Sequence, residues 1–316
     1  MRRVLTRTTP VYVAGHTGLA GSACLRLLRR RGFSRLITAT SAELDLRDRA
    51  ATKEFLGRHR PEVVVAAAAR VGGIAANAAA PAEFLSDNLR IQLSLLDAAR
   101  ELRLPRLLFL GSSCVYPRDC PQPIRESALL SGPLEPTNEA YAIAKIAGLV
   151  HVRSVRREDG LPWISAMPTN LYGPGDRFDA ERAHVLPALL RKFHEAVRTG
   201  ADTVEVWGTG RPRREFLHAD DLAAACLALL QHYDDDEPVN VGTGEDIAIA
   251  GLARLIAETT GFTGEVRFDP SRPDGTPRKL LDVGRVRALG WRPAIGLREG
   301  LASTYDWFVR HQEVVV

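Results

Sequence analysis

A tyrosine and a lysine four residues apart, Tyr141 and Lys145, are the residues of this sequence whose spacing most clearly allows chemistry. They lie in the stretch Glu-Ala-Tyr-Ala-Ile-Ala-Lys, which predicts a helix, and residues four apart on a helix share a face. A nearby ammonium group favours the phenolate, so we expect the tyrosine pKa to fall from about 10. Such a phenol can give a proton to a carbonyl oxygen while hydride reaches the carbonyl carbon. An ordinary amphipathic helix is the alternative, so the weight of the pair depends on its companions.

A glycine-rich turn near the start of the chain is the first companion. It follows an expected strand, Pro10–Ala14, and opens an expected helix, Gly18–Arg31. Glycines permit a tight turn and a close backbone approach, and a helix N-terminus attracts a pyrophosphate. The residues predicted to bind a dinucleotide here are Gly15, His16, Thr17, Gly18, Leu19, Ala20 and Gly21.

The end of the second expected strand, Leu36–Thr40, leaves the choice of dinucleotide open. Sites for NAD usually carry an acid at this point, and sites for NADP an arginine. Neither stands at the tip of this strand: Glu43 follows slightly late, and Arg47 later still.

Short apolar runs alternate with helical patterns through the first half of the chain. This alternation predicts an α/β fold with a Rossmann-like, doubly wound parallel sheet, whose ligands bind beyond the carboxyl ends of the strands. The expected strands are Pro10–Ala14, Leu36–Thr40, Val63–Ala67 and Leu107–Leu110, and the expected helices among them are Gly18–Arg31, Arg47–His59, Asp87–Leu102 and Asn138–Glu158. The alternation ends after Trp163–Met167.

The second half changes rhythm, with turn-rich stretches at Pro168–Phe178 and Pro270–Pro277. We expect an NAD(P)-binding domain over residues 1–168, with returning segments around 203–245, and a smaller, interleaved substrate-binding domain over residues 169–316. The helices expected in this half are Val185–Thr199, Asp220–Gln231, Ile249–Thr260 and Leu297–Gln312.

Composition excludes several classes of protein. The net charge is +4, but the arginines are scattered and form no basic stripe with interleaved aromatics, so nucleic acid is not an expected partner. No apolar stretch approaches the ~20 residues of a membrane span, and none that suits a signal peptide follows the basic Met1–Arg7. The four cysteines show no metal-type pairing, which predicts no metal site and favours a reducing, cytoplasmic compartment.

Taken in order, the glycine-rich turn, the Ser-Ser-Cys loop and the Tyr-x-x-x-Lys pair resemble the extended short-chain dehydrogenase/reductases, and within them the GDP-L-fucose synthase family. The resemblance covers nearly the whole length, and SSCVYP and PDGTPRK are specific to this branch. It rests on AGHTGLAGS, AAARVGGIAAN, LFLGSSCVYP, LEPTNEAYAIAKIAG, MPTNLYGP, HVLPALLRKFHEA, VWGTGRPRREFLHADD, NVGTG, RPDGTPRKLLD and GLASTYDWF.

The resemblance implies 3,5-epimerisation and NAD(P)H-dependent 4-reduction of GDP-4-keto-6-deoxy-D-mannose, giving GDP-L-fucose. The C4 ketone acidifies both neighbouring carbons, so one set of oxyanion donors can serve both enolates. Tyr141 would donate the proton to the C4 oxygen, while Lys145 lowers its pKa and binds the nicotinamide ribose. Ser112 would bind the carbonyl, helped by Ser113.

The family's epimerisation base and its partner acid match Cys114 and His184. A thiol near pKa ~8.5 can be tuned toward neutrality by positive charge, so a cysteine base is chemically reasonable. By residue type alone, a cysteine after a strand is more often a packing residue, and a histidine at a helix start is more often a cap or a surface residue.

Further contacts follow from the same resemblance. Lys192, Arg214 and Lys279 are expected at the GDP pyrophosphate. Trp207 would stack on guanine or fill core, and Asn170 and Asp274 are plausible polar contacts to sugar or nucleotide. The cofactor-binding set also includes Ser41, Gly111, Ser113, Lys145, Pro168, Asn170 and Leu171.

Two departures from the family pattern affect the cofactor. Members that use NADPH carry arginines where this chain has Thr17 and Ser41, so NADPH is expected with NADH left open. Alternatives are an epimerase or reductase of a related GDP-4-keto-sugar, such as a deoxyheptose, and a non-catalytic dinucleotide sensor. By analogy with the superfamily, a homodimer through the helices Asp87–Leu102 and Asn138–Glu158 is expected.

Overall fold

The computed structural model describes residues 5–179, 183–272 and 274–311 of the 316-residue chain. Three sequence expectations reach outside these described residues. They are the start of the basic stretch Met1–Arg7, Pro273 in the stretch Pro270–Pro277, and Gln312 at the expected end of the last helix. Among the described helices, none is both long and apolar enough to cross a lipid bilayer.

A six-stranded parallel sheet forms the centre of the larger part of the molecule, in the order β10-β5-β4-β3-β1-β2. Strands β1 and β3 are buried along their whole length, as expected for valine runs covered on both faces. The chain leaves β1 toward β2 on one side and later returns to β3 on the other, which places a ligand crevice beyond the carboxyl ends of β1 and β3. The strands are β1 (Val11–Ala14), β2 (Leu36–Ile37), β3 (Val63–Ala66), β4 (Arg106–Leu110), β5 (Ile164–Pro168) and β10 (Val239–Val241).

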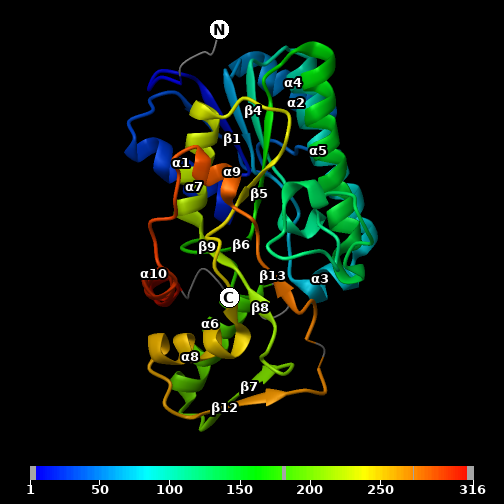
Figure 1. Cartoon of the computed structure of the whole chain (residues 1–316). Helices are drawn as coiled ribbons and strands as arrows, with labels where there is room; N and C mark the ends of the chain where they lie inside the picture. The colour runs from blue at the N-terminus through cyan, green and yellow to red at the C-terminus, as the bar shows by residue number, and fades with distance from the viewer. Residues whose placement is uncertain (1–4, 180–182, 273, 312–316) are drawn as a thin grey trace.

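Helices cover both faces of this sheet, which confirms the predicted fold class (Figure 1). The helices α2 (Arg49–His59), α4 (Pro81–Glu101) and α5 (Glu139–Asp159) lie on one face. The helices α1 (Leu19–Arg30) and α7 (Ala219–His232) lie on the other.

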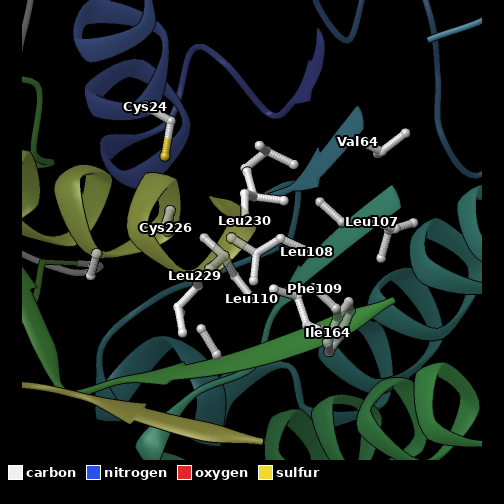
Figure 2. Packing of buried hydrophobic residues seen from close by; sticks show 14 of the residues in the cluster. Cys24, Val64, Leu107, Leu108, Phe109, Leu110, Ile164, Cys226, Leu229 and Leu230 are labelled. Atoms are coloured by element: carbon white, nitrogen blue, oxygen red, sulfur yellow. The ribbon is translucent and has the colours of Figure 1, made fainter. Parts of the chain in front are cut away.

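The contact between α1 and α7 contains two of the four cysteines, Cys24 and Cys226, which are buried free thiols (Figure 2). A hydrogen bond to the Cys24 thiol, together with burial, raises the pKa of the Cys226 thiol. This pair therefore belongs to the core and is poorly suited to thiolate chemistry.

In the first half of the chain, α4, α3 and β2 differ most from the sequence expectation. Helix α4 begins at Pro81 instead of Asp87, because proline suits the first turn of a helix. The short helix α3 (Ile74–Ala79) was not predicted, since its alanine-rich sequence carries no amphipathic period. Strand β2 ends at Ile37, short of the expected Thr40, whose backbone N–H and hydroxyl instead donate to the Glu43 carboxylate at 2.8 and 2.9 Å.

A second hydrophobic core lies in the part of the molecule drawn below the sheet in Figure 1. It gathers aromatic side chains such as Phe178, Phe193 and Phe308, and the Phe178 and Phe308 rings stack with centroids 4.5 Å apart. The elements around this core are α6 (Val185–Thr199), α8 (Ile249–Thr260), α10 (Leu297–Arg310), and the paired strands β7 (Thr203–Trp207) and β12 (Glu265–Asp269).

Small sheets join the two cores. Strand β6 (Asn170–Tyr172) pairs with β9 (Phe216–His218), and β8 (Arg213–Arg214) lies between β11 (Ile247–Ala248) and β13 (Arg278–Lys279). The helix α9 (Gly284–Ala288) follows β13 and packs near β10.

Glu215, between β8 and β9, ties these joining segments together. Its side chain is fully buried, and its carboxylate accepts the backbone N–H groups of Gly244 at 2.7 Å and Leu281 at 2.9 Å. Its carbonyl accepts the side-chain amide of Asn170 at 2.8 Å. Burial raises the pKa of the Glu215 carboxyl. Glu215 thus fixes the segment that carries Lys279 through its carboxylate and the segment that carries Asn170 through its backbone carbonyl.

Candidate active site

The glycine-rich turn after β1 is tight for steric reasons that the structure makes explicit. Gly15 has φ +77, and a Cβ there would lie 2.6 Å from the Cα of Ala68 beyond β3. A Cβ at Gly21 would lie 2.1 Å from the Gly15 carbonyl oxygen. At Gly18 it would meet no closer protein atom than that oxygen, at 3.5 Å.

These three glycines therefore serve two purposes. Gly15 and Gly21 allow the chain to fold on itself, whereas Gly18 leaves the N-terminus of α1 open to an approaching group. An exposed helix N-terminus with free N–H groups is the usual place for a pyrophosphate, so the residues present fit a dinucleotide.

The two positions where arginines are expected to hold an adenosine 2′-phosphate carry no charge in this chain. Thr17 and Ser41 are both exposed and uncharged. The Glu43 carboxylate accepts hydrogen bonds from Thr40, and these bonds are the main cause that lowers the pKa of Glu43. A weaker electrostatic interaction with His16 acts in the same direction. The Nδ1 atom of His16 is buried and has no hydrogen-bond partner among the described residues.

Helix α5 carries Tyr141 and Lys145 on its inner side. The Lys145 side chain is 4% exposed, and its ammonium donates a 2.8 Å hydrogen bond to the carbonyl of Leu110 at the end of β4. The same ammonium lies 4.9 Å from the ring centroid of Phe109 and 5.9 Å from that of Tyr141. Gly148 lets α5 approach β4 this closely, because a Cβ there would lie 2.3 Å from the Phe109 ring.

The electrostatics of this pair differ from the sequence expectation. Burial raises the pKa of the Tyr141 phenol, the neighbouring Cys114 adds to this, and a hydrogen bond with Ser112 partly opposes it. Burial also lowers the pKa of the Lys145 ammonium to about 8. The expectation that Lys145 lowers the tyrosine pKa is therefore wrong for the protein without bound ligands, in which Tyr141 is a neutral phenol with a proton to donate.

The loop after β4 places Ser112 and Cys114 beside that phenol. Ser112 caps the 3₁₀ turn η1 (Ser113–Val115), and its hydroxyl accepts the Cys114 backbone N–H at 3.2 Å. Both side chains are half-buried, whereas Ser113 is buried. Ser112, Cys114 and Tyr141 thus form one group at the carboxyl end of the sheet, where ligands bind in this class of fold.

Two further residues reach the Cys114 sulfur. The side-chain amide of Asn138, in the 3₁₀ turn η3 (Pro136–Asn138), lies with Nδ2 3.4 Å from Sγ. The Lys279 ammonium on β13 lies 3.8 Å from the same sulfur. The sequence predicts Lys279 at the pyrophosphate instead, and it gives no role to Asn138.

His184 lies immediately before α6, as its N-cap residue. Its side chain stays accessible to solvent, although enough protein packs around the ring to lower its pKa by desolvation. Among the described residues, no hydrogen bond or ion pair joins His184 to the group around Cys114.

The segments at the end of β5 hold the remaining residues expected at the cofactor. Gly111 is buried, and its N–H donates to Ala166 on the neighbouring strand at 2.8 Å. Pro168 ends β5, while Asn170 and Leu171 are half-buried in β6. The Asn170 amide is already used by the Glu215 carbonyl.

The residues expected at the nucleotide lie along the second core. Trp207 at the end of β7 is 61% exposed, so the alternative of a core position is wrong, and the Arg272 guanidinium lies 5.1 Å from its ring centroid. Arg214 is half-buried, and burial lowers its pKa. Lys192 is exposed on α6 and donates to the carbonyl of Glu205.

The Asp274 carboxylate contacts another protein loop, a contact that the sequence analysis did not predict. Its carboxylate accepts the backbone N–H of Thr209 at 2.6 Å and the Thr209 hydroxyl at 2.7 Å. Because both oxygens are taken by Thr209, Asp274 ties two loops together, and the prediction of a polar substrate contact did not foresee this use.

Sequence reasoning missed Asn138, Arg272 and Glu215. Asn138 could have been noticed, because it stands three residues before Tyr141 at the entrance of the same helix. Arg272 and Glu215 had no comparable signal, since their partners are far away in sequence.

Comparison with known proteins identifies the family of the chain. Residues 11–242 match the model of the NAD dependent epimerase/dehydratase family. GDP-L-fucose synthase 1 of Arabidopsis thaliana is 52% identical over 305 residues, covering 96% of this chain and 94% of that protein.

Solved structures of enzymes that act on GDP-sugars have a similar fold. A GDP-6-OMe-4-keto-L-xylo-heptose reductase from C. jejuni has a TM-score of 0.93 at 33% identity, covering 98% of this chain and 100% of that one. A GDP-L-fucose synthetase from Naegleria fowleri bound to NADP has a TM-score of 0.90 at 29% identity, covering 98% and 97%. The chain therefore belongs to the NAD dependent epimerase/dehydratase family, within which it is similar to the GDP-L-fucose synthases.

Proposed function

We propose that this protein is a bifunctional enzyme that epimerises GDP-4-keto-6-deoxy-D-mannose at C3 and C5 and reduces it at C4, giving GDP-L-fucose. The observation that carries the proposal is the group formed by Ser112, Cys114 and Tyr141, with Lys145 behind it. This group holds a hydroxyl, a thiol and a neutral phenol together, which are the functions that the two reactions require. The 52% identity to a GDP-L-fucose synthase over nearly the whole chain supports the choice of substrate.

In the reductive half, Tyr141 gives its proton to the C4 oxygen and Ser112 donates a hydrogen bond to the same oxygen. The raised pKa of Tyr141 keeps the phenol protonated until that oxygen becomes basic. Lys145 holds the inner side of the site through Leu110 and binds the nicotinamide ribose. Gly15–Gly21 would hold the pyrophosphate of a reduced nicotinamide dinucleotide, which would supply the hydride.

In the epimerising half, Cys114 is the base and His184 the acid. Cys114 removes the proton next to the ketone, and Ser112 and Tyr141 stabilise the enolate oxygen. His184, whose side chain is accessible at the start of α6, returns a proton from the opposite face of the carbon.

We propose that the GDP moiety lies along the second core. Trp207, exposed and flanked by Arg272, offers a stacking surface for guanine. Arg214 and Lys192 supply positive charge for the pyrophosphate, and Asn170 a polar contact.

The reductant is proposed to be NADPH, with NADH as the alternative. NADP in the Naegleria relative supports NADPH. The uncharged side chains at Thr17 and Ser41, together with the Glu43 carboxylate near them, support NADH, because none of these side chains attracts a 2′-phosphate.

A second candidate substrate is a GDP-4-keto-heptose. The close likeness in fold to the heptose reductase from C. jejuni favours it, whereas the lower sequence identity to that enzyme speaks for the deoxyhexose.

A homodimer through α4 and α5 is also proposed. Both helices expose apolar side chains, namely Leu93, Ile143 and Val150, in a position where a second copy could cover them. A cytoplasmic location accords with four free cysteines.

The test is product analysis of the purified protein with GDP-4-keto-6-deoxy-D-mannose and, in parallel, a GDP-4-keto-heptose, each with NADPH and with NADH. Formation of GDP-L-fucose, identified by NMR against a standard, is the expected result. Turnover of the heptose alone would replace the proposed substrate, and no turnover of either ketose would overturn the proposal.

A further inference from the structure

The surroundings of the Cys114 sulfur contain a contact set that the proposed function does not use. Three segments distant in sequence meet there: η1 with Cys114, η3 with Asn138, and β13 with Lys279. The Asn138 amide nitrogen and the Lys279 ammonium lie 3.4 and 3.8 Å from Sγ. Both groups are donors toward sulfur, and they reach it from different elements.

We propose that Asn138 and Lys279 are positioning residues that hold Cys114 as a thiolate, so that Lys279 serves the epimerisation base and not the substrate pyrophosphate. The identification of Cys114 as that base rests on the proposed function, whereas the state of its sulfur can be measured without any sugar.

The chemistry of the donors favours the thiolate. A thiol sulfur is only a weak acceptor, and an ammonium group can donate but never accept, so both contacts strengthen when the sulfur carries the charge. Positive charge near a cysteine is also the usual device for obtaining a reactive thiolate. The Oδ1 atom of Asn138 is buried and has no partner among the described residues, so the contact with the sulfur is the hydrogen bond that this side-chain amide makes there.

The backbone fixes both donors in place. After Lys279, the N–H of Leu280 donates to the Gln122 side chain at 2.9 Å, and the carbonyl of Leu280 accepts the N–H of Ile124 at 2.8 Å. The N–H of Leu281 donates to the buried Glu215 carboxylate at 2.9 Å. Asn138 directly precedes α5, so the helix that carries Tyr141 also aims the amide at Cys114.

Other titratable groups near Cys114 do not replace Lys279. Tyr141 adjoins Cys114 but remains a neutral phenol. Cys120 lies close enough to Lys279 for their charges to interact, and burial raises the pKa of its thiol despite that ammonium. Lys279 is thus the cation that faces the Cys114 sulfur within the described part of the chain.

The proton balance of the step is simple. The thiolate takes the proton from C3 or C5, an S–H bond forms while the C–H bond breaks, and the electron pair moves into the enolate. Lys279 stays protonated throughout and releases its contact as the sulfur becomes neutral.

The experiment measures alkylation of Cys114 by iodoacetamide, site by site with mass spectrometry, from pH 6 to 9. A Cys120→Ser background removes the other half-exposed thiol, while Cys24 and Cys226 are buried. In this background, Lys279→Gln is compared with Lys279→Arg, with Asn138→Leu, and with the control Lys53→Gln. Lys53 lies on α2 and pairs with Glu101 at the end of α4. Unfolding midpoints confirm that each variant is folded.

We expect Lys279→Gln to slow alkylation at pH 7 about tenfold and Asn138→Leu about threefold, with Lys279→Arg close to the parent and Lys53→Gln unchanged. In Lys279→Gln and Asn138→Leu, the kcat of deuterium exchange at C3 and C5 should fall in parallel with the rate of alkylation. Unchanged alkylation in Lys279→Gln, with a raised KM for the GDP-sugar, would overturn the proposal and return Lys279 to the pyrophosphate. The Cys120→Ser parent could show no deuterium exchange at C3 and C5 of the sugar while its alkylation still depends on Lys279. In that case the proposed function has failed and the thiolate proposal stands.

Discussion

Replacing Asp176 by asparagine should stabilise the protein increasingly as the pH rises. Asp176 follows β6 and is 9% exposed; its Oδ1 accepts the Arg177 N–H at 2.8 Å, and its Oδ2 is buried with no hydrogen-bond partner among the described residues. Burial raises the pKa of this carboxyl to about 7. In the unfolded chain the same carboxyl has a pKa of about 3.9.

The sign and size of the change in unfolding free energy with pH follow from proton linkage. Between these two pKa values the folded state holds a proton that the unfolded state has lost, so stability falls as the pH rises and stops falling above the folded pKa. From pH 5 to pH 8 the loss amounts to about 2.5 kcal/mol for a single carboxyl with these pKa values. Asparagine cannot ionise, so Asp176→Asn does not suffer this loss.

The assay is urea unfolding of both proteins at pH 5 and pH 8, followed by tryptophan fluorescence. The quantity of interest is how much the stability difference between variant and parent changes between the two pH values. Packing and solvation differences between the two side chains cancel in this quantity. A change smaller than about 0.5 kcal/mol would refute the assignment of a raised pKa to Asp176.

Three further substitutions test separate parts of the site. Gly21→Ala should abolish dinucleotide binding in calorimetric titrations, because the new Cβ would lie 2.1 Å from the Gly15 carbonyl oxygen; unchanged affinity would contradict the tight turn. Tyr141→Phe should slow 4-reduction by about 100-fold or more, because the C4 oxygen loses its proton donor, and should slow deuterium exchange at C3 and C5 less, because Ser112 still donates a hydrogen bond to the enolate oxygen; equal loss of both steps would count against this division of roles. Trp207→Ala should raise KM for the GDP-sugar about tenfold with kcat nearly unchanged, since the exposed ring offers binding area and no chemistry; a fall in kcat alone would exclude guanine stacking.

Local patterns predicted the parts of the fold that depend on neighbouring residues. The valine runs of β1 and β3 and the amphipathic sequence of α6 gave strands and a helix close to their observed bounds. The glycine turn was predictable for the same reason, because Gly15, Gly18 and Gly21 act within one turn of chain. The alanine-rich sequence of α3 has no amphipathic period, so no local pattern predicted this helix.

Residues whose partners lie far away in sequence were not predictable. Lys279 reaches Cys114 across 165 residues, and no local pattern distinguishes that position from a pyrophosphate contact. The predicted fall of the Tyr141 pKa was wrong. Helical spacing shows that Tyr141 and Lys145 share a face, but it does not show how deeply both side chains are buried. Burial of charge is set by the packed fold, and it outweighed the attraction between neighbours.

The most direct test of the proposed two-step reaction is NMR of GDP-4-keto-6-deoxy-D-mannose incubated with the protein in D₂O, first without any reductant and then with one added. We expect deuterium at both C3 and C5 before the reductant is added, no deuterium with a Cys114→Ser variant, and GDP-L-fucose after the addition. Reduction at C4 without prior deuterium at either carbon would contradict it, since the protein would then be a reductase alone and the thiol beside Tyr141 would have no part in the chemistry.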